Sequence, residues 1–190
     1  MDAIILAAGR GMRLRPLTDA TPKPLIPIAG RGTLLRLLDV LPKAVSRVVI
    51  VIGYLGEQIR QEIGDVSHDR PVEYVIQEVL DGTGGALRWA RPSIHSERFL
   101  VLMGDDLYVA RDLEQVTEYE RGMLIKTAKL PKDGMDIWQM RQGKIVGMRT
   151  GQVGHKGSMN AGAYVLGHEW FETSPTSTPG KTDEWSIPHA

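Results

Sequence analysis

The residues whose types and spacing could do chemistry gather first in a short segment near the N-terminus. An apolar run at residues 3–8 is followed by Gly9 and Gly11, and Arg13 and Lys23 stand just beyond. Glycine lets the backbone adopt conformations that other residues disfavour and approach a ligand closely, so successive N–H groups can converge on an anion. Arginine adds a planar fork of donors and lysine a point charge, and both suit phosphate. The segment therefore predicts a polyphosphate-binding loop after a buried strand.

Two common phosphate motifs do not fit this segment. A P-loop requires G-x-x-x-x-G-K-[ST], and the sequence GKT at residues 180–182 follows a Pro-rich stretch with no strand before it. A dinucleotide fingerprint starting at Gly9 would need a glycine at position 14, where Leu14 stands. Gly-x-Gly by itself is more typical of an ordinary strand-to-loop turn, so the longer string has to decide.

The longer string resembles the signature of the sugar-phosphate nucleotidyltransferases, or nucleoside diphosphate sugar pyrophosphorylases. That signature is usually written L-A-A-G-x-G-T-R-L-x-P-L-T, followed by P-K-P. Here residues 6–18 read LAAGRGMRLRPLT and residues 22–24 read PKP, with Met12 in place of the usual Thr or Ser. The resemblance implies that Arg13 holds the β- and γ-phosphates and that Lys23 bridges the α-phosphate and the sugar phosphate. It also implies nucleotide contacts from loop residues Ala8, Gly9, Gly11 and Met12.

Adjacent carboxylates follow a second apolar run. Residues 101–104 read VLMG, and Asp105 and Asp106 come directly after them. Mg²⁺ prefers hard oxygen ligands and commonly takes one or two carboxylates together with waters and substrate phosphates. An Asx turn or a helix cap explains a pair of aspartates at least equally well. The resemblance places Mg²⁺ on Asp105, with Asp106 behind it or solvated, so magnesium is the expected cofactor.

An amide and a glycine follow a further strand-like run. Gln77 ends residues 72–77, and Gly82 stands five positions later. A glutamine amide has one acceptor and two donors, so it can pair with the imide edge of a pyrimidine beside a glycine backbone. A strand end before a helix with Thr83 as N-cap is an equally plain explanation. In the resembling enzymes such a pair contacts uracil or thymine, which favours UTP or dTTP as the nucleotide.

Residues 160–164, with the sequence NAGAY, are similar to the family's N-A-G-x-Y at the sugar pocket. The resemblance therefore implies sugar binding by Asn160 and Gly162. The family usually has Glu-Lys-Pro before this strand, and residues 146–151 contain neither the Glu nor the Lys. Arg149 or Lys156 could replace the Lys, whereas the Glu has no visible substitute.

The C-terminal segment departs from the family as well. Thr182-Asp183 resembles a pair that precedes the last core helix, but the later Trp-x-Asp, whose carboxylate shares the metal, does not occur before Ala190. Three explanations stay open: a sequence truncated at its C-terminus, a substitute carboxylate such as Asp183, or an incomplete metal site. No left-handed β-helix acyltransferase domain is expected.

Composition limits the class of protein. The 190 residues predict one domain, with a nucleotide-binding half at residues 1–110 and a sugar-binding half at residues 111–190. Lys plus Arg and Asp plus Glu number 23 each, so no overall charge favours nucleic acid or a membrane surface. The sequence has no cysteine, no signal-peptide pattern and no apolar run of the ~20 residues that a membrane helix needs. We expect a cytoplasmic protein, either a monomer or a homo-oligomer.

Strand-like and helix-like segments alternate through the first half. Strands are expected at residues 3–8, 48–52, 72–77 and 99–103, and helices at 33–44, 54–63 and 84–91. The second half predicts a helix at 113–119, strands at 123–130 and 161–166, a hairpin at 136–148, a loop at 173–181 and a last helical turn at 183–189. The expected fold is a Rossmann-like three-layer α/β/α nucleotidyltransferase domain, with a mostly parallel central sheet and a hairpin in the sugar-binding part. Such folds bind ligands outside the carboxyl ends of the strands, where the Gly9 loop, Gln77 and Asp105 all fall.

These residues lead to one main functional hypothesis and two alternatives. The main hypothesis is Mg²⁺-dependent nucleotidyl transfer from a nucleoside triphosphate to a sugar 1-phosphate, giving an NDP-sugar and pyrophosphate. A cytidylyltransferase acting on a non-sugar phosphate such as phosphocholine would share the first loop and the lysine. A catalytically silent subunit that binds an NDP-sugar is the alternative from a different class, because Met12 and the absent distal Asp depart from the family.

Overall fold

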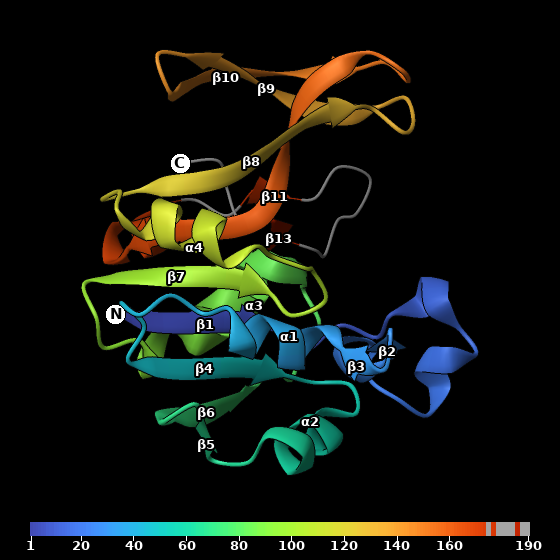
Figure 1. Cartoon of the computed structure of the whole chain (residues 1–190), viewed down its shortest axis with the longest axis vertical. Coiled ribbons are helices and arrows are strands. Elements are labelled where there is room, and N and C mark those ends of the chain that lie inside the picture. The colour runs from blue at the N-terminus through green and yellow to red at the C-terminus, as the bar shows by residue number, and fades with distance from the viewer. Residues whose placement is uncertain (174–175, 178–184, 187–190) are drawn as a thin grey trace.

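The structure is a computed structural model, and it describes residues 1–173, 176–177 and 185–186. Its centre is a seven-stranded sheet with the order β5-β6-β4-β1-β7-β11-β8 (Figure 1). The strands β1, β4, β6 and β7 run parallel, whereas β5, β11 and β8 pair antiparallel with their neighbours. The sheet strands are β1 Asp2–Leu6, β4 Arg47–Ile52, β5 Val66–Ser67, β6 Arg70–Ile76, β7 Arg98–Met103, β8 Gly122–Lys129 and β11 Lys156–Gly167.

Helices cover both faces of the sheet, as a mostly parallel sheet requires. The α-helices are α1 Thr33–Asp39, α2 Gly56–Ile63, α3 Gly82–Ala90 and α4 Ala110–Thr117. Short 3-10 segments lie at η1 Met12–Leu14, η2 Leu17–Asp19, η3 Lys23–Leu25, η4 Arg91–Ser93 and η5 His168–Glu172. The predicted helices are therefore all present within the first 120 residues, with boundaries that differ by a few positions.

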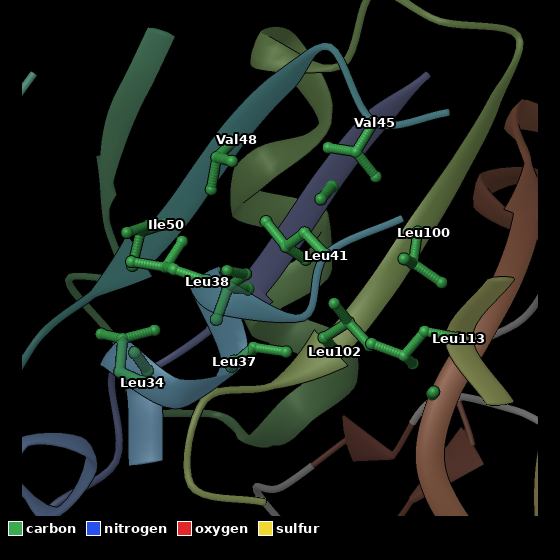
Figure 2. Packing of buried hydrophobic residues seen from close by; sticks show 14 of the residues in the cluster. Leu34, Leu37, Leu38, Leu41, Val45, Val48, Ile50, Leu100, Leu102 and Leu113 are labelled. Carbon is green, nitrogen blue, oxygen red and sulfur yellow. The ribbon is translucent and has the colours of Figure 1, made fainter. Parts of the chain in front are cut away.

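Alternation along the strands divides the core into two clusters. One cluster joins alternate residues of β1, β4 and β7 to the apolar faces of α1, α2 and α4; Figure 2 shows Leu34, Leu37 and Leu38 of α1 against Val48 and Ile50 of β4. The other cluster packs the intervening strand residues against α3 and η5. Because successive strand side chains point to opposite faces, an apolar strand needs cover on both sides. The three-layer α/β/α fold predicted from the sequence is confirmed.

Helix α1 ends earlier than the predicted residue 44. The N–H of Val40 bonds to the carbonyl of Leu37, and the chain leaves the helix before Pro42, which disfavours helical conformation in the residue before it. The guanidinium of Arg70 then donates to the carbonyl oxygens of Leu41, Pro42 and Val45 at 3.4, 3.2 and 3.0 Å. An arginine from β6 thus satisfies carbonyl groups of the segment that follows α1.

The predicted hairpin is confirmed as β9 Met135–Arg141 and β10 Lys144–Gly151, joined at Gln142 and Gly143. It lies beyond β8, at the top of Figure 1. Two further small ladders pair β2 Pro27–Ile28 with β3 Arg31–Gly32, and β12 Thr176–Ser177 with β13 Trp185–Ser186. The predicted last helical turn is wrong at residues 185–186, which form a strand that pairs with residues 176–177 of the same chain; the rest of that turn lies outside the described residues. The predicted loop at 173–181 contains β12.

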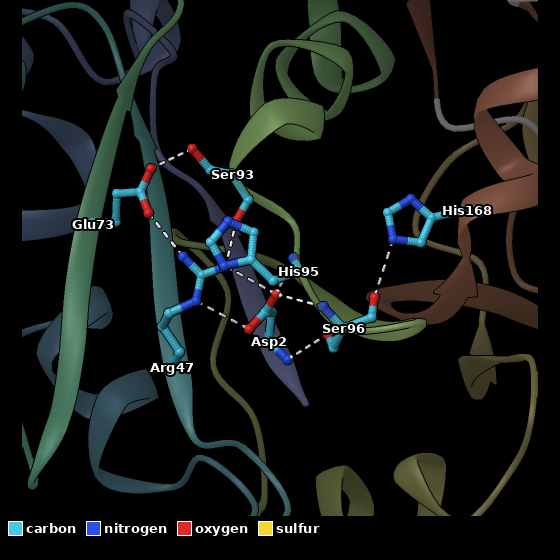
Figure 3. A network of polar contacts seen from close by, with 7 residues as sticks. All are labelled: Asp2, Arg47, Glu73, Ser93, His95, Ser96 and His168. Atoms are coloured by element: carbon cyan, nitrogen blue, oxygen red, sulfur yellow. Dashed lines mark hydrogen bonds and ion pairs between the residues drawn. The ribbon is translucent and has the colours of Figure 1, made fainter.

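The first residue of β1 ties together four segments at the amino end of the parallel strands (Figure 3). The carboxylate of Asp2 accepts hydrogen bonds from the guanidinium of Arg47 at 3.0 and 3.2 Å, and from the backbone N–H groups of His95 and Ser96 at 2.7 and 3.0 Å. Arg47 also pairs with Glu73 of β6 at 2.7 Å. Burial alone would raise the pKa of Asp2, but these donors outweigh it and lower the pKa to about 2.

Within the described residues, no helix is long and apolar enough to cross a membrane.

Candidate functional site

The main cavity lies at the carboxyl edge of the parallel strands and has a volume of about 1060 Å³. The ends of β1, β6 and β7 form its floor, since Ala8, Gln77 and Met103 all line it. In Figure 1 the blue segment after β1 extends from the sheet on the side toward which the β4 and β7 arrows point. The sequence prediction that the three suspected elements share one edge is confirmed. Predicted site residues lining this cavity are Ala8, Gly9, Gly11, Met12, Arg13, Lys23, Gln77, Gly82 and Asp105.

The glycine-rich loop has one position at which glycine is required by its conformation. Gly11 has a φ of +62°, and a Cβ there would stand 2.8 Å from the Cγ2 atom of Thr18. Thr18 in turn donates from its hydroxyl to the Gly11 carbonyl at 3.0 Å, which fixes the turn. Gly9 has no such φ, and a Cβ there would meet nothing within 4 Å. The expected unusual backbone conformation is thus found at Gly11 and not at Gly9. The absence of a side chain at Gly9 leaves open space beside the loop.

The two cavity cations of the signature occupy different places. The side chain of Arg13 is exposed in the 3-10 turn η1, at the rim. Lys23 begins η3 and reaches across the cavity, where its Nζ forms an ion pair with Oδ2 of Asp105. These two residues are 82 positions apart in the sequence. Between them, Arg13 and Lys23 place positive charge at the outer and the inner part of one cavity.

The carboxylate of Asp105 offers oxygen ligands of the kind that Mg²⁺ takes. Asp105 stands two residues after the end of β7 and lines the cavity. Mg²⁺ commonly takes one or two carboxylates with waters and phosphate oxygens. The described part of the chain contains no group of three or more His, Cys, Asp or Glu side chains that could hold a metal by itself. Asp183 and Thr182 lie outside the described residues. A cation at Asp105 would therefore rely on phosphate oxygens for much of its coordination.

Tyr108 connects the turn after β7 to the segment that resembles the sugar pocket. Its hydroxyl accepts a hydrogen bond from the N–H of Met103 at 3.1 Å and donates to the carbonyl of Gly162 at 2.8 Å. Burial raises the pKa of Tyr108, and the nearby carboxylates of Asp106 and Asp105 raise it further. Burial also raises the pKa of Asp106, with Asp105 adding to the effect and Lys23 opposing it. The tyrosine therefore stays a neutral hydroxyl that joins the end of β7 to the middle of β11.

Asn160 and Gly162 form an irregularity in β11 beside this tyrosine. Pairing between β11 and β8 shifts register between Asn160 and Tyr164, and Gly162 has a φ of +74°. The Asn160 side chain accepts from the Gly162 N–H at 2.8 Å and donates to the hydroxyl of Tyr164. A Cβ at Gly162 would lie 2.5 Å from Oδ2 of Asp106. The structure thus brings this pair beside the Asp105 turn, although neither residue lines the main cavity.

Gln77 and Gly82 both line the cavity and contact each other. Gln77 is buried, at 5% exposure, and its Nε2 donates to Oδ1 of Asp81 at 2.8 Å and to the carbonyl of Gly82 at 3.3 Å. Gly82 begins α3 with a φ of +94°. The predicted spacing of five residues therefore folds into a single corner, with Asp81 as an additional member.

Comparison with known sequences places the chain. A nucleotidyl transferase family profile matches residues 2–123, which include the glycine-rich loop, Lys23, Gln77 and Asp105. The chain belongs to the nucleotidyl transferase family. The recognition made from the L-A-A-G-x-G signature is confirmed.

The individual relatives of this chain differ in length and in the activity that their names give. The chain is 33% identical over 173 residues to the bifunctional protein GlmU of Methanocaldococcus jannaschii, covering 90% of this chain and 41% of that protein. It is 28% identical over 185 residues to D-glycero-α-D-manno-heptose 1-phosphate guanylyltransferase of Aneurinibacillus thermoaerophilus, covering 93% of this chain and 79% of the relative. The chain spans less than half the length of the GlmU relatives that it matches.

A solved structure shares the fold of this chain. HddC from Yersinia pseudotuberculosis in complex with GMP-PN superposes with a TM-score of 0.71 and 25% identity, covering 92% of this chain and 80% of HddC.

Two residues of the candidate site were not predicted from the sequence. Asp81 stands immediately before the predicted Gly82, and only its position four residues after Gln77 could have indicated a contact. Tyr108 contacts a carbonyl 54 residues away, and no local pattern signals such a pairing.

Proposed function

We propose that this protein transfers a nucleotidyl group from a nucleoside triphosphate to a sugar 1-phosphate, releasing pyrophosphate. The observation that carries the proposal is the single cavity that gathers the Gly11 loop, Arg13, Lys23, Asp105 and Gln77. Hydrogen-bond donors suited to phosphate, a carboxylate and the Gln77 amide, which is suited to a nucleobase, thus line the same cavity. A family profile that covers residues 2–123 supports the same chemistry.

The reaction needs no nucleophile from the protein. An oxygen of the sugar 1-phosphate attacks the α-phosphorus in line, the bond from this phosphorus to the bridging oxygen breaks, and pyrophosphate leaves with the electron pair. The protein contributes by orienting the two substrates and by stabilising the charge that develops on the phosphoryl oxygens. A cavity with fixed cations and backbone donors is suited to that task.

Two of the cations that line the cavity, Arg13 and Lys23, have a proposed role in that step. Arg13, at the exposed rim, holds the β- and γ-phosphates, and the Gly9, Gly11 and Met12 backbone helps to bind them. Lys23, deeper in the cavity, bridges the α-phosphate and the incoming sugar phosphate. Asp105 is the proposed ligand of Mg²⁺, which when bound supplies a Lewis acid for phosphate oxygens. The ion pair of Lys23 with Asp105 supports these roles, because it places both groups at one point.

The sugar is proposed to lie beside the β11 irregularity. Asn160 offers an amide, and Gly162 lets β11 pass close to the turn that carries Asp105 and Asp106. Arg149 and Lys156 line a separate depression of about 510 Å³ on the hairpin side. They are therefore weaker candidates for the sugar phosphate than Lys23.

The nucleotide is proposed to carry uracil or thymine, because Gln77 and Gly82 keep the spacing that contacts these bases in similar enzymes. Guanine is the second candidate: the Aneurinibacillus relative is a guanylyltransferase, and the HddC structure contains GMP-PN. Both groups of bases present a ring N–H beside a carbonyl.

Pyrophosphate release tests the proposed function. The protein is incubated with Mg²⁺ and each of the four ribonucleoside triphosphates or dTTP, against a panel of sugar 1-phosphates and phosphocholine. Release that depends on one sugar phosphate with UTP, dTTP or GTP is the expected result. Release from CTP with phosphocholine would identify a cytidylyltransferase instead. Nucleotide binding without release from any pair would contradict the proposal and favour a silent binding subunit.

A further inference from the structure

The amide of Gln77 has a fixed orientation. Its Nε2 lies 2.8 Å from Oδ1 of Asp81 and 3.3 Å from the carbonyl oxygen of Gly82, and both of these atoms can only accept hydrogen bonds. The group facing them must therefore be the NH₂ group, and its two hydrogens are both used. If the amide were flipped, its oxygen would face a carboxylate and a carbonyl, which is unfavourable.

The remaining polar atom of this side chain is available to a ligand. Oε1 of Gln77 accepts no hydrogen bond from the described residues. If this atom were fully buried, it would be a buried polar atom without a partner. Among the described residues, the only side-chain atom of that kind is Nε1 of Trp170. Oε1 is therefore accessible, and the accessible space beside Gln77 is the main cavity. Gln77 presents this cavity with an acceptor and with no donor.

Asp81 holds this orientation at the expense of its usual role. It is the N-cap residue of α3, where an aspartate commonly accepts from the N–H groups of the first helical turn. Here its side chain makes no capping hydrogen bond, and the carboxylate turns to Gln77 instead.

Gly85 makes room for this arrangement. A Cβ at Gly85 would stand 1.8 Å from Oδ1 of Asp81, which no side chain could tolerate without displacing the carboxylate. Gly85 lies inside α3, where glycine is less favourable than alanine for the helix. Glycine at this helical position therefore leaves the space that the Asp81 carboxylate occupies.

We infer that Asp81 is a positioning residue that sets base selectivity by keeping Gln77 an obligate hydrogen-bond acceptor. The inference rests on the proposed function, in which Gln77 faces the base. An acceptor opposite the ring nitrogen of the Watson–Crick edge favours bases whose ring nitrogen carries hydrogen: uracil, thymine and guanine. Cytosine and adenine present a lone pair at that nitrogen, so they place an acceptor against an acceptor. The site thereby selects a ring N–H without distinguishing a pyrimidine from a purine.

The test compares nucleotide affinities in Asp81→Asn with those in the wild-type protein. Isothermal titration calorimetry with Mg²⁺ gives the dissociation constants of UTP, GTP, CTP and ATP, which differ only in the base. Asparagine can accept or donate toward Gln77, so the amide can turn and offer its NH₂ group to the cavity. We expect the preference for UTP or GTP over CTP and ATP to fall at least about tenfold, because a hydrogen-bond mismatch on a buried group is relieved.

A double-mutant comparison separates positioning from a general effect. Asp81→Asn should leave the base preference unchanged in a Gln77→Ala background, since Asp81 acts only through that amide. Gly85→Ala retains the charge of Asp81 but displaces its carboxylate, so it should reduce the preference as Asp81→Asn does. Asp39→Asn removes a carboxylate from a surface ion pair with Arg31 and serves as the matched control with unchanged preference.

Two outcomes would overturn the inference. One is an equal change in the affinities of all four triphosphates in Asp81→Asn, and the other is an undiminished effect of Asp81→Asn in the Gln77→Ala background. Because binding is measured without turnover, the proposed function is judged separately by pyrophosphate release. If the wild-type protein turns over but Asp81→Asn keeps the base preference, only the role of Asp81 is contradicted. If Asp81→Asn loses the base preference but the wild-type protein releases no pyrophosphate, only the proposed function is contradicted.

Discussion

Replacing Asp2 by asparagine tests how the first residue of β1 stabilises the parallel sheet. The variant keeps the size of the side chain but removes the negative charge that faces Arg47 and the N–H groups of His95 and Ser96. The carboxylate is only 6% exposed, so solvent screens these interactions little. Asp2 therefore contributes chiefly through its ionised form.

The lowered pKa gives the magnitude of this contribution. The pKa of Asp2 falls from an ordinary value of 3.8 to about 2 in the folded protein. Since one pKa unit corresponds to about 1.4 kcal/mol, ionised Asp2 stabilises the fold by about 2 kcal/mol at neutral pH. Because the folded-state pKa is the lower one, this stability is present above about pH 4 and is lost as the pH falls toward about pH 2.

The assay is urea unfolding of wild type and Asp2→Asn at several pH values. We expect the variant to be less stable by about 2 kcal/mol at neutral pH, and the difference to shrink to about half near pH 3, as Asp2 becomes protonated in the unfolded chain. Asp39→Asn, at a surface pair with Arg31, should cost less than about 1 kcal/mol at every pH. A difference between wild type and Asp2→Asn that stays constant with pH would refute the electrostatic explanation.

Three further predictions concern the proposed reaction and are checked by pyrophosphate release. Lys23→Ala should lower turnover by a factor of ~10² to 10³, because a preorganised cation is lost from the transition state; turnover within a few-fold of wild type would contradict that role. Tyr108→Phe removes the bond to the Gly162 carbonyl and should raise KM for the sugar phosphate more than it changes the affinity for the triphosphate, whereas equal effects would assign Tyr108 a purely structural role. Chelation by EDTA should abolish turnover and added Mg²⁺ should restore it, with Asp105→Asn requiring more Mg²⁺; activity that persists in EDTA would count against a metal at Asp105.

Local patterns in the sequence determined the family and most of the fold. The L-A-A-G-x-G string and P-K-P are contiguous, so they identify the loop without any knowledge of its surroundings. Apolar β-branched runs such as residues 48–52 define buried strands, because their period and composition suit a sheet covered on both faces. The common edge of the Gly9 loop, Gln77 and Asp105 also followed, since parallel strands place their carboxyl ends together.

Tertiary structure alone decided the contacts between distant segments. The ion pair between Lys23 and Asp105 joins residues 82 positions apart, and Tyr108 reaches Gly162 across 54 positions. Arg70 of β6 likewise donates to the carbonyls of Leu41, Pro42 and Val45, which lie 29, 28 and 25 positions away. Such contacts depend on strand register and on which side chains the packed layers bring within hydrogen-bonding distance. Neither is contained in the periodicity of a single segment, so the sequence by itself placed the site while the packing determined its internal geometry.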